Sequence, residues 1–430
     1  MTDHEVRWNR TRWMREDRFG MFIHWGLYAI PARGEWVRST ERISVEDYEQ
    51  YFEEFDPVCY DPKKWAKLAR QAGMKYAVLT TKHHDGFCLF DSAYTDYKAT
   101  NTKAGRDLVR EYVDAFRAEG IKVGFYYSLL DWHHPDYPHY GDRQHPMREN
   151  PAYGNENRNF SNYVTYLHNQ VRELMTNYGK IDLLWFDFSY QELYGEAWRG
   201  TELVQMIRSL QPEIIINDRL SGDASVHDAL KAEQLPAYAG DFQSPEQIIP
   251  LDGVRDGKGN PVTWEACMTL NDHWGYAVFD HNYKPAKTVI RMLTDCVSKG
   301  GNLLLNVGPT AKGEIPKESV QILEEIGAWM RENGESIYGC GPAGLPRPAW
   351  GCYTRKGDFL YAHVYDVFTN MLVLEGLADK VAYARMEADG AELSLERPWN
   401  SAKFPNDLFV NLGQVRLPDA IDTVVKLKLK

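Results

Sequence analysis

The sequence predicts a (β/α)8 barrel of the TIM type followed by a small C-terminal β-sandwich. Three observations lead to this fold class. Short apolar runs alternate with amphipathic stretches along residues 18–335, which is typical of βα units around a parallel sheet. Polar and aromatic residues gather directly after the apolar runs, where barrel enzymes carry their sites. Beyond Gly339 the sequence changes to short strand-like segments separated by turns, which is typical of a sandwich.

The expected barrel elements follow one another in order. The first strand ends in a His-Trp-Gly turn, and the first clear helix starts with Pro62 and closes on Gly73, as proline and glycine favour. About eight strands are expected, within the size range of one barrel, and the patterns at 237–242 and 264–268 are the weakest. The expected strands cover residues 18–26, 76–81, 121–128, 181–188, 213–219, 237–242, 264–268 and 302–307, and the expected helices cover 62–73, 106–119, 160–178, 201–210, 285–298 and 316–333.

A doubly wound sheet is the alternative architecture for alternating strands and helices. Such a sheet would carry a glycine-rich phosphate-binding turn after its first strand. The first strand here ends in His24-Trp25-Gly26 instead, so the barrel is favoured. We place the barrel at residues 1–338 and the β-sandwich at residues 339–430, with a hairpin at 353–365.

Composition restricts the classes of partner. Hydrophobic residues make up 43% of the chain and charged residues 26%, as in ordinary globular proteins, while aromatic residues reach 13%. Flat aromatic rings can form protein cores, and they can also stack on sugars. The formal net charge of −12 argues against nucleic acid or an anionic membrane surface as a partner.

The cysteines and the N-terminus indicate a cellular compartment. Six scattered cysteines without a CxxC pair fit neither a zinc motif nor a disulfide framework. The N-terminus has no apolar signal-peptide core, and no run of about 18 apolar residues occurs. We therefore expect a cytoplasmic protein with free thiols, although a signal peptide removed beforehand would leave the same sequence.

Asp187 is the leading catalytic candidate. It lies in the apolar run 181–188, which is typical of a strand buried on both faces. An unpaired buried carboxylate is costly, so Asp187 either caps the strand through hydrogen bonds or lies at the mouth of a pocket. Trp185, two residues earlier, projects to the same side of a strand. A tryptophan beside a carboxylate at the C-terminal end of a barrel strand is typical of sugar-cleaving sites.

A glycosidase also needs a second carboxyl group to protonate the leaving oxygen. Glu246 follows Pro245, which restrains that segment, but any one acidic residue here could equally be a solvated loop residue. Arg219 either orients a catalytic carboxylate or pairs with its neighbour Asp218, and the sequence leaves both interpretations open. The candidates for the second carboxyl group are Glu233, Asp241, Glu246 and Glu265.

Other polar residues follow the first two expected strands. His24, His83 and His84 each come after a strand, and neutral imidazoles can exchange hydrogen bonds with sugar hydroxyls. Glu35 and Trp36 offer a carboxylate acceptor and an indole donor. Adjacent histidines also suggest a metal-dependent hydrolase, but no HxH or HExxH spacing accompanies them.

Six motifs together resemble the α-L-fucosidase family of glycoside hydrolases. They occur in the order of that family within residues 8–335: FGMFIHWG at 19–26, KHHDGF at 82–87, YYS at 126–128, WFD at 185–187, NDR at 217–219 and GGNLLLNVGP at 300–309. The resemblance implies a barrel followed by a β-sandwich, and a retaining mechanism without a metal or cofactor.

The resemblance also implies roles for individual residues. Asp187 matches the nucleophile of the family. Glu246 is preferred as the acid/base because residues 241–246 fit a branch with an Asp-aromatic-x-Ser/Thr-Pro-Glu segment, whereas Glu265 starts the next expected strand. The residues that match the fucose pocket are His24, Glu35, Trp36, His83, His84, one of Tyr126 and Tyr127 (we take Tyr127), Trp185 and Arg219.

These observations predict a retaining exo-glycosidase that hydrolyses terminal α-L-fucosyl linkages through a covalent fucosyl-enzyme intermediate. The expected substrate is a fucosylated oligosaccharide or glycoconjugate. The alternative is a catalytically weak fucose-binding protein on the same fold, and the presence of both Asp187 and Glu246 argues against it. The sequence leaves a homo-oligomer open.

Overall fold

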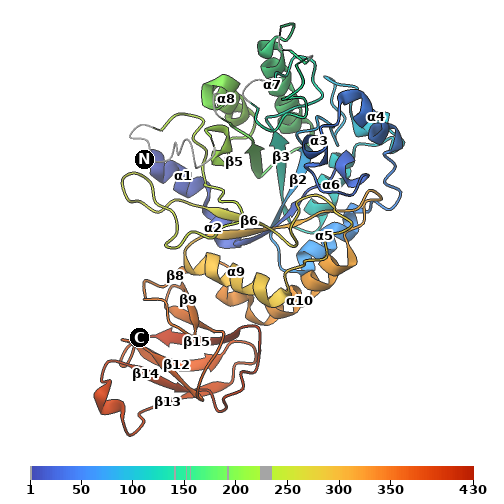
Figure 1. Ribbon diagram of the computed structural model, residues 1–430. Helices are drawn as coiled ribbons and strands as arrows, with labels where there is room; N and C mark the ends of the chain where they lie inside the picture. Colours follow the sequence, from blue (N-terminus) through green and yellow to red (C-terminus); the bar gives the residue numbers. More distant parts are fainter. Residues whose placement is uncertain (1, 140–141, 152, 155, 191–192, 223–234) are drawn as a thin grey trace.

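A curved sheet of seven parallel strands forms the centre of the N-terminal part of the protein (Figure 1). The computed structural model describes residues 2–139, 142–151, 153–154, 156–190, 193–222 and 235–430. The strands of this sheet are β1 (Phe19–Ile23), β2 (Tyr76–Lys82), β3 (Lys122–Ser128), β4 (Leu183–Asp187), β5 (Ile215–Ile216), β6 (Glu265–Thr269) and β7 (Asn302–Val307). Their order is β5-β4-β3-β2-β1-β7-β6. Nearly every side chain in them is buried, as expected for strands covered on both faces.

The segment between β5 and β6 takes the place of an eighth strand without forming a regular ladder. Phe242 bridges to Asn217 just after β5, whereas Gln243 and Glu246 bridge to residues at β6, all in the parallel sense. The expected strand at 237–242 is therefore replaced by isolated bridges along 242–246. Two local features prevent a regular strand in this segment. Gly240 has a φ of +79°, and a side chain at this position would collide with the Asn217 carbonyl. The proline at 245 has no N–H to donate.

Helices cover the outside of this sheet. The six helices expected from the sequence are present as α5 to α10, whereas the four N-terminal helices were not anticipated. The helices are α1 (Asp3–Arg10), α2 (Arg12–Asp17), α3 (Val37–Thr40), α4 (Val45–Glu54), α5 (Pro62–Gln71), α6 (Leu108–Ala118), α7 (Phe160–Asn177), α8 (Gly200–Leu210), α9 (Ala286–Ser298) and α10 (Lys317–Asn333).

The start of α5 shows why the sequence forms helices at these points. The Asp61 side chain accepts hydrogen bonds from the backbone N–H groups of the first turn, and Pro62 stands where a missing N–H costs nothing. The helix then buries Trp65, Leu68 and Ala69 at helical spacing against the sheet. Asp107 and Asn159 cap α6 and α7 in the same way. Capping and amphipathic spacing therefore agree at each of these helices.

An antiparallel sheet makes up the C-terminal part. Its strands are β8 (Gly341–Pro342), β9 (Gly351–Lys356), β10 (Phe359–Val364), β11 (Met371–Leu374), β12 (Val381–Met386), β13 (Glu392–Glu396), β14 (Leu408–Asn411) and β15 (Thr423–Leu429), in the order β11-β14-β13-β12-β15-β10-β9-β8. β13 pairs with β12 through its first residues and with β14 through its last. Side chains from both halves, among them Leu360, Leu372, Val410 and Leu427, share one core. The expected two-layer packing is thus built from one continuous sheet.

Helices α9 and α10 separate the barrel strands from the C-terminal sheet (Figure 1). Arg291 of α9 donates to the carbonyl oxygens of Tyr365 and Ile421, and Trp329 of α10 donates to the Asp422 carbonyl. The buried Asp422 side chain accepts from His363 at 2.7 Å. These bonds satisfy buried polar groups on both sides of the junction, so the sheet packs on the helices through specific contacts.

Candidate active site

A cavity lies at the C-terminal ends of the barrel strands, where most of the expected site residues come together. Each of β1, β2, β3, β4 and β6 contributes a side chain, either from within the strand or from just beyond its end. Loops after β1 and β6 close the sides. The cavity is lined by Phe22, His24, Glu35, Trp36, His83, Tyr126, Trp185, Asp187, Phe188, Glu246, Cys267 and Trp274. Three carboxyl groups, those of Glu35, Asp187 and Glu246, are thus gathered with several aromatic rings at one end of the barrel.

Asp187 ends β4 and is held by three hydrogen-bond donors. Tyr126 Oη donates to Oδ2 at 2.8 Å, while Arg219 Nη1 and the Phe188 backbone N–H donate to Oδ1, each at 3.0 Å. Burial raises the pKa of Asp187 to about 6; the Arg219 charge opposes this rise, and the nearby Glu246 charge adds to it. At neutral pH Asp187 is therefore an ionised, oriented carboxylate in a largely dry site, which suits a nucleophile.

The guanidinium of Arg219 bridges the two carboxyl groups. Its Nη1 contacts Asp187 and its Nη2 contacts Oε2 of Glu246, each at 3.0 Å. Burial alone would lower the pKa of Arg219, but the two carboxylates raise it well above its usual value. The Glu246 side chain is 40% exposed, whereas that of Asp187 is 11% exposed. Arg219 thus pairs with the cavity carboxylates and not with its neighbour Asp218.

Glu246 stands on the irregular segment, which is fixed at its start and in its middle. Asp241 is buried and accepts from Arg10 of α1 and Arg208 of α8. Further along, Ser244 donates to Asp218 from both its backbone N–H and its hydroxyl group. Asp241 therefore anchors this segment and is not a candidate for acid/base chemistry.

His24 and His83 are buried as neutral rings. Burial lowers the pKa of His24 to about 3, although its hydrogen bond to Asn306 Oδ1, 2.7 Å long, acts in the opposite direction. Burial and the neighbouring His84 and His24 lower the pKa of His83 well below its usual value. Nδ1 of His83 has no hydrogen-bond partner among the described residues. Neutral imidazoles of this kind can donate to and accept from hydroxyl groups.

Glu35 lies on the loop after β1 and faces the loop after β6. Its Oε2 accepts the Gly275 backbone N–H at 2.8 Å. Burial raises the pKa of Glu35, and the Gly275 hydrogen bond partly offsets the rise. Trp36, beside it, packs its ring against Phe188 at a centroid distance of 5.5 Å. Aromatic side chains thus surround the few polar groups, as in most small-molecule sites.

Two expected pocket residues lie behind the cavity wall. The Tyr127 hydroxyl points away from the site and donates to Gln170 of α7 at 2.7 Å. Tyr126, which contacts Asp187, is the tyrosine of the cavity, so the choice of Tyr127 was wrong. His84 is fully buried between Trp36 and Trp132, with ring centroids 4.8 and 4.1 Å away, and does not line the cavity. It supports Trp36 from behind.

Two of the acid/base candidates from the sequence remain, Glu233 and Glu265. Glu265 is fully buried at the start of β6, at the opposite end of that strand from the cavity mouth. Glu233 lies outside the described residues. Among the candidates that the structure describes, Glu246 alone lines the cavity.

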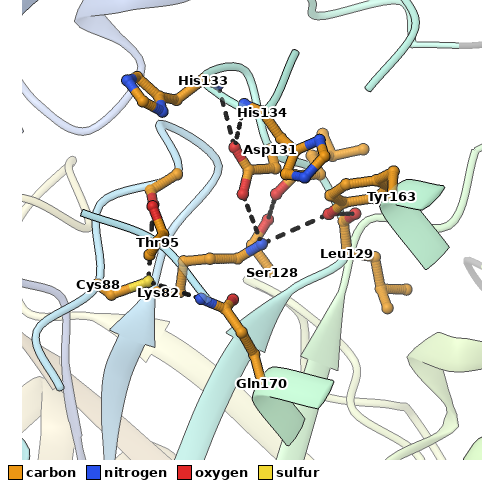
Figure 2. Close-up of polar contacts among 12 residues, drawn as sticks. Lys82, Cys88, Thr95, Ser128, Leu129, Asp131, His133, His134, Tyr163 and Gln170 are labelled. Carbon is orange, nitrogen blue, oxygen red and sulfur yellow. Dashed lines mark hydrogen bonds and ion pairs between the residues drawn. The ribbon is translucent and has the colours of Figure 1, made fainter. Parts of the chain in front are cut away.

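The turn that carries His83 and His84 is held by a buried ion pair. Figure 2 shows the Lys82 amine between Asp131 and Tyr163, with Nζ to Asp131 Oδ2 at 3.0 Å. The other oxygen of Asp131 accepts the backbone N–H groups of His133 and His134 (Figure 2). Because both charges are fully buried and paired, removal of either one would leave a strongly disfavoured unpaired charge. The pair ties the end of β2 to the loop after β3.

Several lining residues were not anticipated from the sequence. Trp274 packs against His24 at a centroid distance of 5.0 Å and comes from the loop after β6. Phe22 and Cys267 reach the cavity from inside β1 and β6, and Phe188 follows Asp187 with a φ of +71°. Trp274 had a sequence signal, because it lies in an aromatic cluster a few residues after the expected strand at 264–268.

Among the described residues, no three His, Cys, Asp or Glu side chains come together as a potential metal site. No helix in the part of the chain that the structure describes has the length and apolar character needed to cross a membrane.

Comparison with known proteins gives a consistent result. The sequence model of the family "Alpha-L-fucosidase" matches residues 2–335. The chain belongs to the α-L-fucosidase family. Tissue α-L-fucosidase of Bos taurus is 31% identical over 376 residues, which cover 81% of this chain and 74% of the bovine protein.

Solved structures of this family have the same fold. α-L-Fucosidase isoenzyme 1 from Paenibacillus thiaminolyticus is 61% identical, with a TM-score of 0.96, over 99% of this chain and 100% of that chain. An α-L-fucosidase GH29 from Bacteroides thetaiotaomicron is 31% identical, with a TM-score of 0.84, over 98% of this chain and 96% of that one. The latter structure is of a trapped covalent intermediate formed with 2-fluoro-fucosyl fluoride. The chain is thus a glycoside hydrolase of a retaining family.

Proposed function

We propose that Asp187 is the nucleophile and Glu246 the general acid/base in the hydrolysis of terminal α-L-fucosyl linkages with retention of configuration. The observation that carries this assignment is the bridge by Arg219, which contacts both carboxyl groups at 3.0 Å in one cavity. A retaining glycosidase needs two such groups, about 5–5.5 Å apart, on either side of the scissile bond.

The two steps use these residues in turn. In the first step, Asp187 attacks the anomeric carbon while Glu246 gives its proton to the leaving oxygen. A covalent fucosyl ester forms and the alcohol departs. In the second step, Glu246 takes a proton from water, the water oxygen attacks the same carbon, and Asp187 leaves as a carboxylate. Arg219 compensates the charge of whichever carboxyl group is ionised.

The cavity lining supports fucose as the sugar. The neutral His24 and His83, with Glu35 and the Trp36 N–H, can bind ring hydroxyls through directional hydrogen bonds. The apolar side chains of Phe22, Trp185, Phe188, Cys267 and Trp274 offer a wall for the C5 methyl group. Such a site discriminates hydroxyl stereochemistry strongly and a single extra carbon only weakly.

The leaving group would belong to a fucosylated oligosaccharide or glycoconjugate, because Glu246 lies at the exposed rim of the cavity. The absence of nucleic acid and membrane partners and a cytoplasmic location stay predictions from the sequence, which leaves a homo-oligomer open. No observation favours a fucose-binding protein without activity, since both carboxyl groups line the same cavity.

Aryl glycosides test this proposal directly. The protein should cleave an aryl α-L-fucoside much faster than the matched β-D-fucoside and β-D-galactoside. Proton NMR of the first product should show the α-anomer of L-fucose before mutarotation. Faster cleavage of either β-glycoside, or a β-anomer as first product, would contradict the assignment.

A further inference from the structure

Glu265 is a buried carboxyl group that the two-step mechanism does not use. It is fully buried at the start of β6, and its Cα lies opposite that of Asn302 on β7. The Tyr76 hydroxyl of β2 donates to Oε2 of Glu265, and Asn302 Nδ2 lies 3.2 Å from the same hydroxyl. A carboxyl group inside a barrel is expensive unless it is paired, so its presence beneath the cavity calls for a function.

The Glu265 carboxyl group also lies close enough to Trp185 for the indole N–H to act on it. Oε1 of Glu265 and Nε1 of Trp185 are both buried, and neither atom has a well-aligned hydrogen-bond partner among the described residues. Burial raises the pKa of Glu265 to about 8, while hydrogen bonding from Tyr76 and then from the Trp185 N–H lowers it. Two donors from different strands therefore converge on one carboxyl group.

Trp185 in turn supports the two side chains that hold Asp187. Its ring stacks on Tyr126, with centroids 5.6 Å apart and planes at 19°. The guanidinium carbon of Arg219 lies 4.8 Å from the centroid of the same ring. Tyr126 binds Oδ2 of Asp187 and Arg219 binds Oδ1. A shift of the indole ring would thus reach both oxygens of Asp187.

We propose that Glu265 is a positioning residue for the fucosidase reaction, which holds the Trp185 ring so that Tyr126 and Arg219 keep Asp187 aimed at the anomeric carbon. This inference rests on the proposed function of Asp187. Glu265 does not touch the sugar, and it acts only through the indole ring. Its effect therefore belongs to the attack by Asp187 and not to proton transfer to the leaving group.

Two substitutions separate this role from general packing. Glu265→Gln keeps the shape of a neutral carboxylic acid, and its carbonyl oxygen can still accept from the Trp185 N–H. Glu265→Leu removes both acceptors and releases the indole and the Tyr76 hydroxyl. The matched control is Gln170→Met, which removes an equally buried polar side chain that binds Tyr127 on the outer side of the strands.

The rate of covalent labelling by 2-fluoro-fucosyl fluoride reports the attack by Asp187, because fluoride leaves without a proton donor. We expect Glu265→Leu to label about 30- to 100-fold more slowly than wild type, since small displacements of reacting groups carry penalties of this size. Its KM for an aryl α-L-fucoside should change little, because Glu265 touches no part of the sugar. Glu265→Gln should stay within about threefold of wild type, and Gln170→Met should label at the wild-type rate even if it unfolds at a lower temperature.

The possible results distinguish failure of the Glu265 inference from failure of the proposed function. Labelling of Glu265→Leu at the wild-type rate, or equal slowing of Gln170→Met, would overturn the inference and leave the proposed function intact. A Gln variant as slow as the Leu variant would also overturn it, because the acid itself would then be required. Should Glu265→Leu fail to fold, Tyr76→Phe removes one bond to Glu265 and should slow labelling about threefold or more; an unchanged rate would count against the inference. A wild type that neither labels at Asp187 nor hydrolyses the fucoside would overturn both proposals.

Discussion

The hydroxyl group of Tyr126 donates a hydrogen bond to Oδ2 of Asp187, 2.8 Å away. Both side chains are buried, and the bond joins the neighbouring strands β3 and β4 at their C-terminal ends. A hydrogen bond to a carboxylate in a buried site is stronger than one between neutral groups. Tyr126 therefore orients the carboxylate and favours its ionised form.

Comparison of Tyr126→Phe with Tyr127→Phe tests which of these two neighbouring side chains of β3 faces the cavity. Tyr126→Phe should lower kcat on an aryl α-L-fucoside by about 10- to 100-fold, because it removes a charge-assisted hydrogen bond of roughly 1.5–3 kcal/mol. Tyr127→Phe should leave kcat within about twofold but cost about 1–2 kcal/mol of unfolding free energy, because the Gln170 carbonyl loses its donor. Steady-state kinetics and urea unfolding measure the two effects. A larger loss of kcat in Tyr127→Phe would contradict the described site.

The nucleophile assignment makes a stronger prediction. Asp187→Ala removes the group that forms the covalent bond, so kcat should fall by several orders of magnitude while the fold persists. Circular dichroism checks the fold, and mass spectrometry after 2-fluoro-fucosyl fluoride should find the label on Asp187 in wild type and no label in the variant. If Asp187→Ala kept a tenth of the wild-type turnover, the assignment would be wrong.

The sequence was sufficient to predict the strand ends but not which side chains face the cavity. Apolar runs and their polar ends identified β1 to β4, and hence His24, His83 and Asp187. Alternation along a strand has period two, so one of Tyr126 and Tyr127 had to face the site. The phase depends on the pairing of Tyr126 with Trp185 across β3 and β4. That register is a tertiary property, and the sequence alone does not contain it.

The structure around Glu246 also depends on tertiary contacts that the sequence alone does not reveal. Isolated bridges along 242–246 give no alternating pattern, so the sequence could place a strand there only weakly. The anchoring of Asp241 by Arg10 and Arg208 joins α1, α8 and this segment, which are far apart in sequence. Arg219 likewise forms its ion pairs with Asp187 and Glu246 and not with its sequence neighbour Asp218, because the fold brings those two carboxylates close to it.

The raised pKa of Asp187 predicts how activity depends on pH. Attack requires the ionised form, so kcat/KM for an aryl fucoside should fall about tenfold per pH unit below a midpoint near pH 6. The Tyr126 hydrogen bond lowers the pKa of Asp187. Tyr126→Phe should therefore move this acid limb to higher pH. A limb that stayed in place, or moved to lower pH, would contradict the role given to Tyr126.

The same pKa predicts a stability effect. The pKa of Asp187 rises from 3.8 to about 6 on folding, so between these values the folded protein binds more protons than the unfolded chain. This group therefore lowers the unfolding free energy as the pH rises through that range, by up to about 3 kcal/mol above pH 6. Asp187→Asn mimics the neutral form and should be more stable than wild type at pH 7.5 but not at pH 4. Thermal or urea unfolding at the two pH values measures this difference, and a variant less stable than wild type at pH 7.5 would contradict the prediction.

Glu246 makes the last prediction, which concerns leaving groups. A general acid helps most when the leaving group is poor, so Glu246→Ala should severely damage cleavage of a natural fucosyl disaccharide and slow the first step on an activated aryl fucoside much less. The second step also needs Glu246 as base, and the aryl substrate should therefore give a burst of phenol followed by slow turnover. Azide needs no base, so it should restore turnover and yield a fucosyl azide. Glu233→Ala and Glu265→Ala are the comparisons: azide rescue of either one, without rescue of Glu246→Ala, would move the acid/base to that residue and leave the Asp241–Glu246 segment only a structural role.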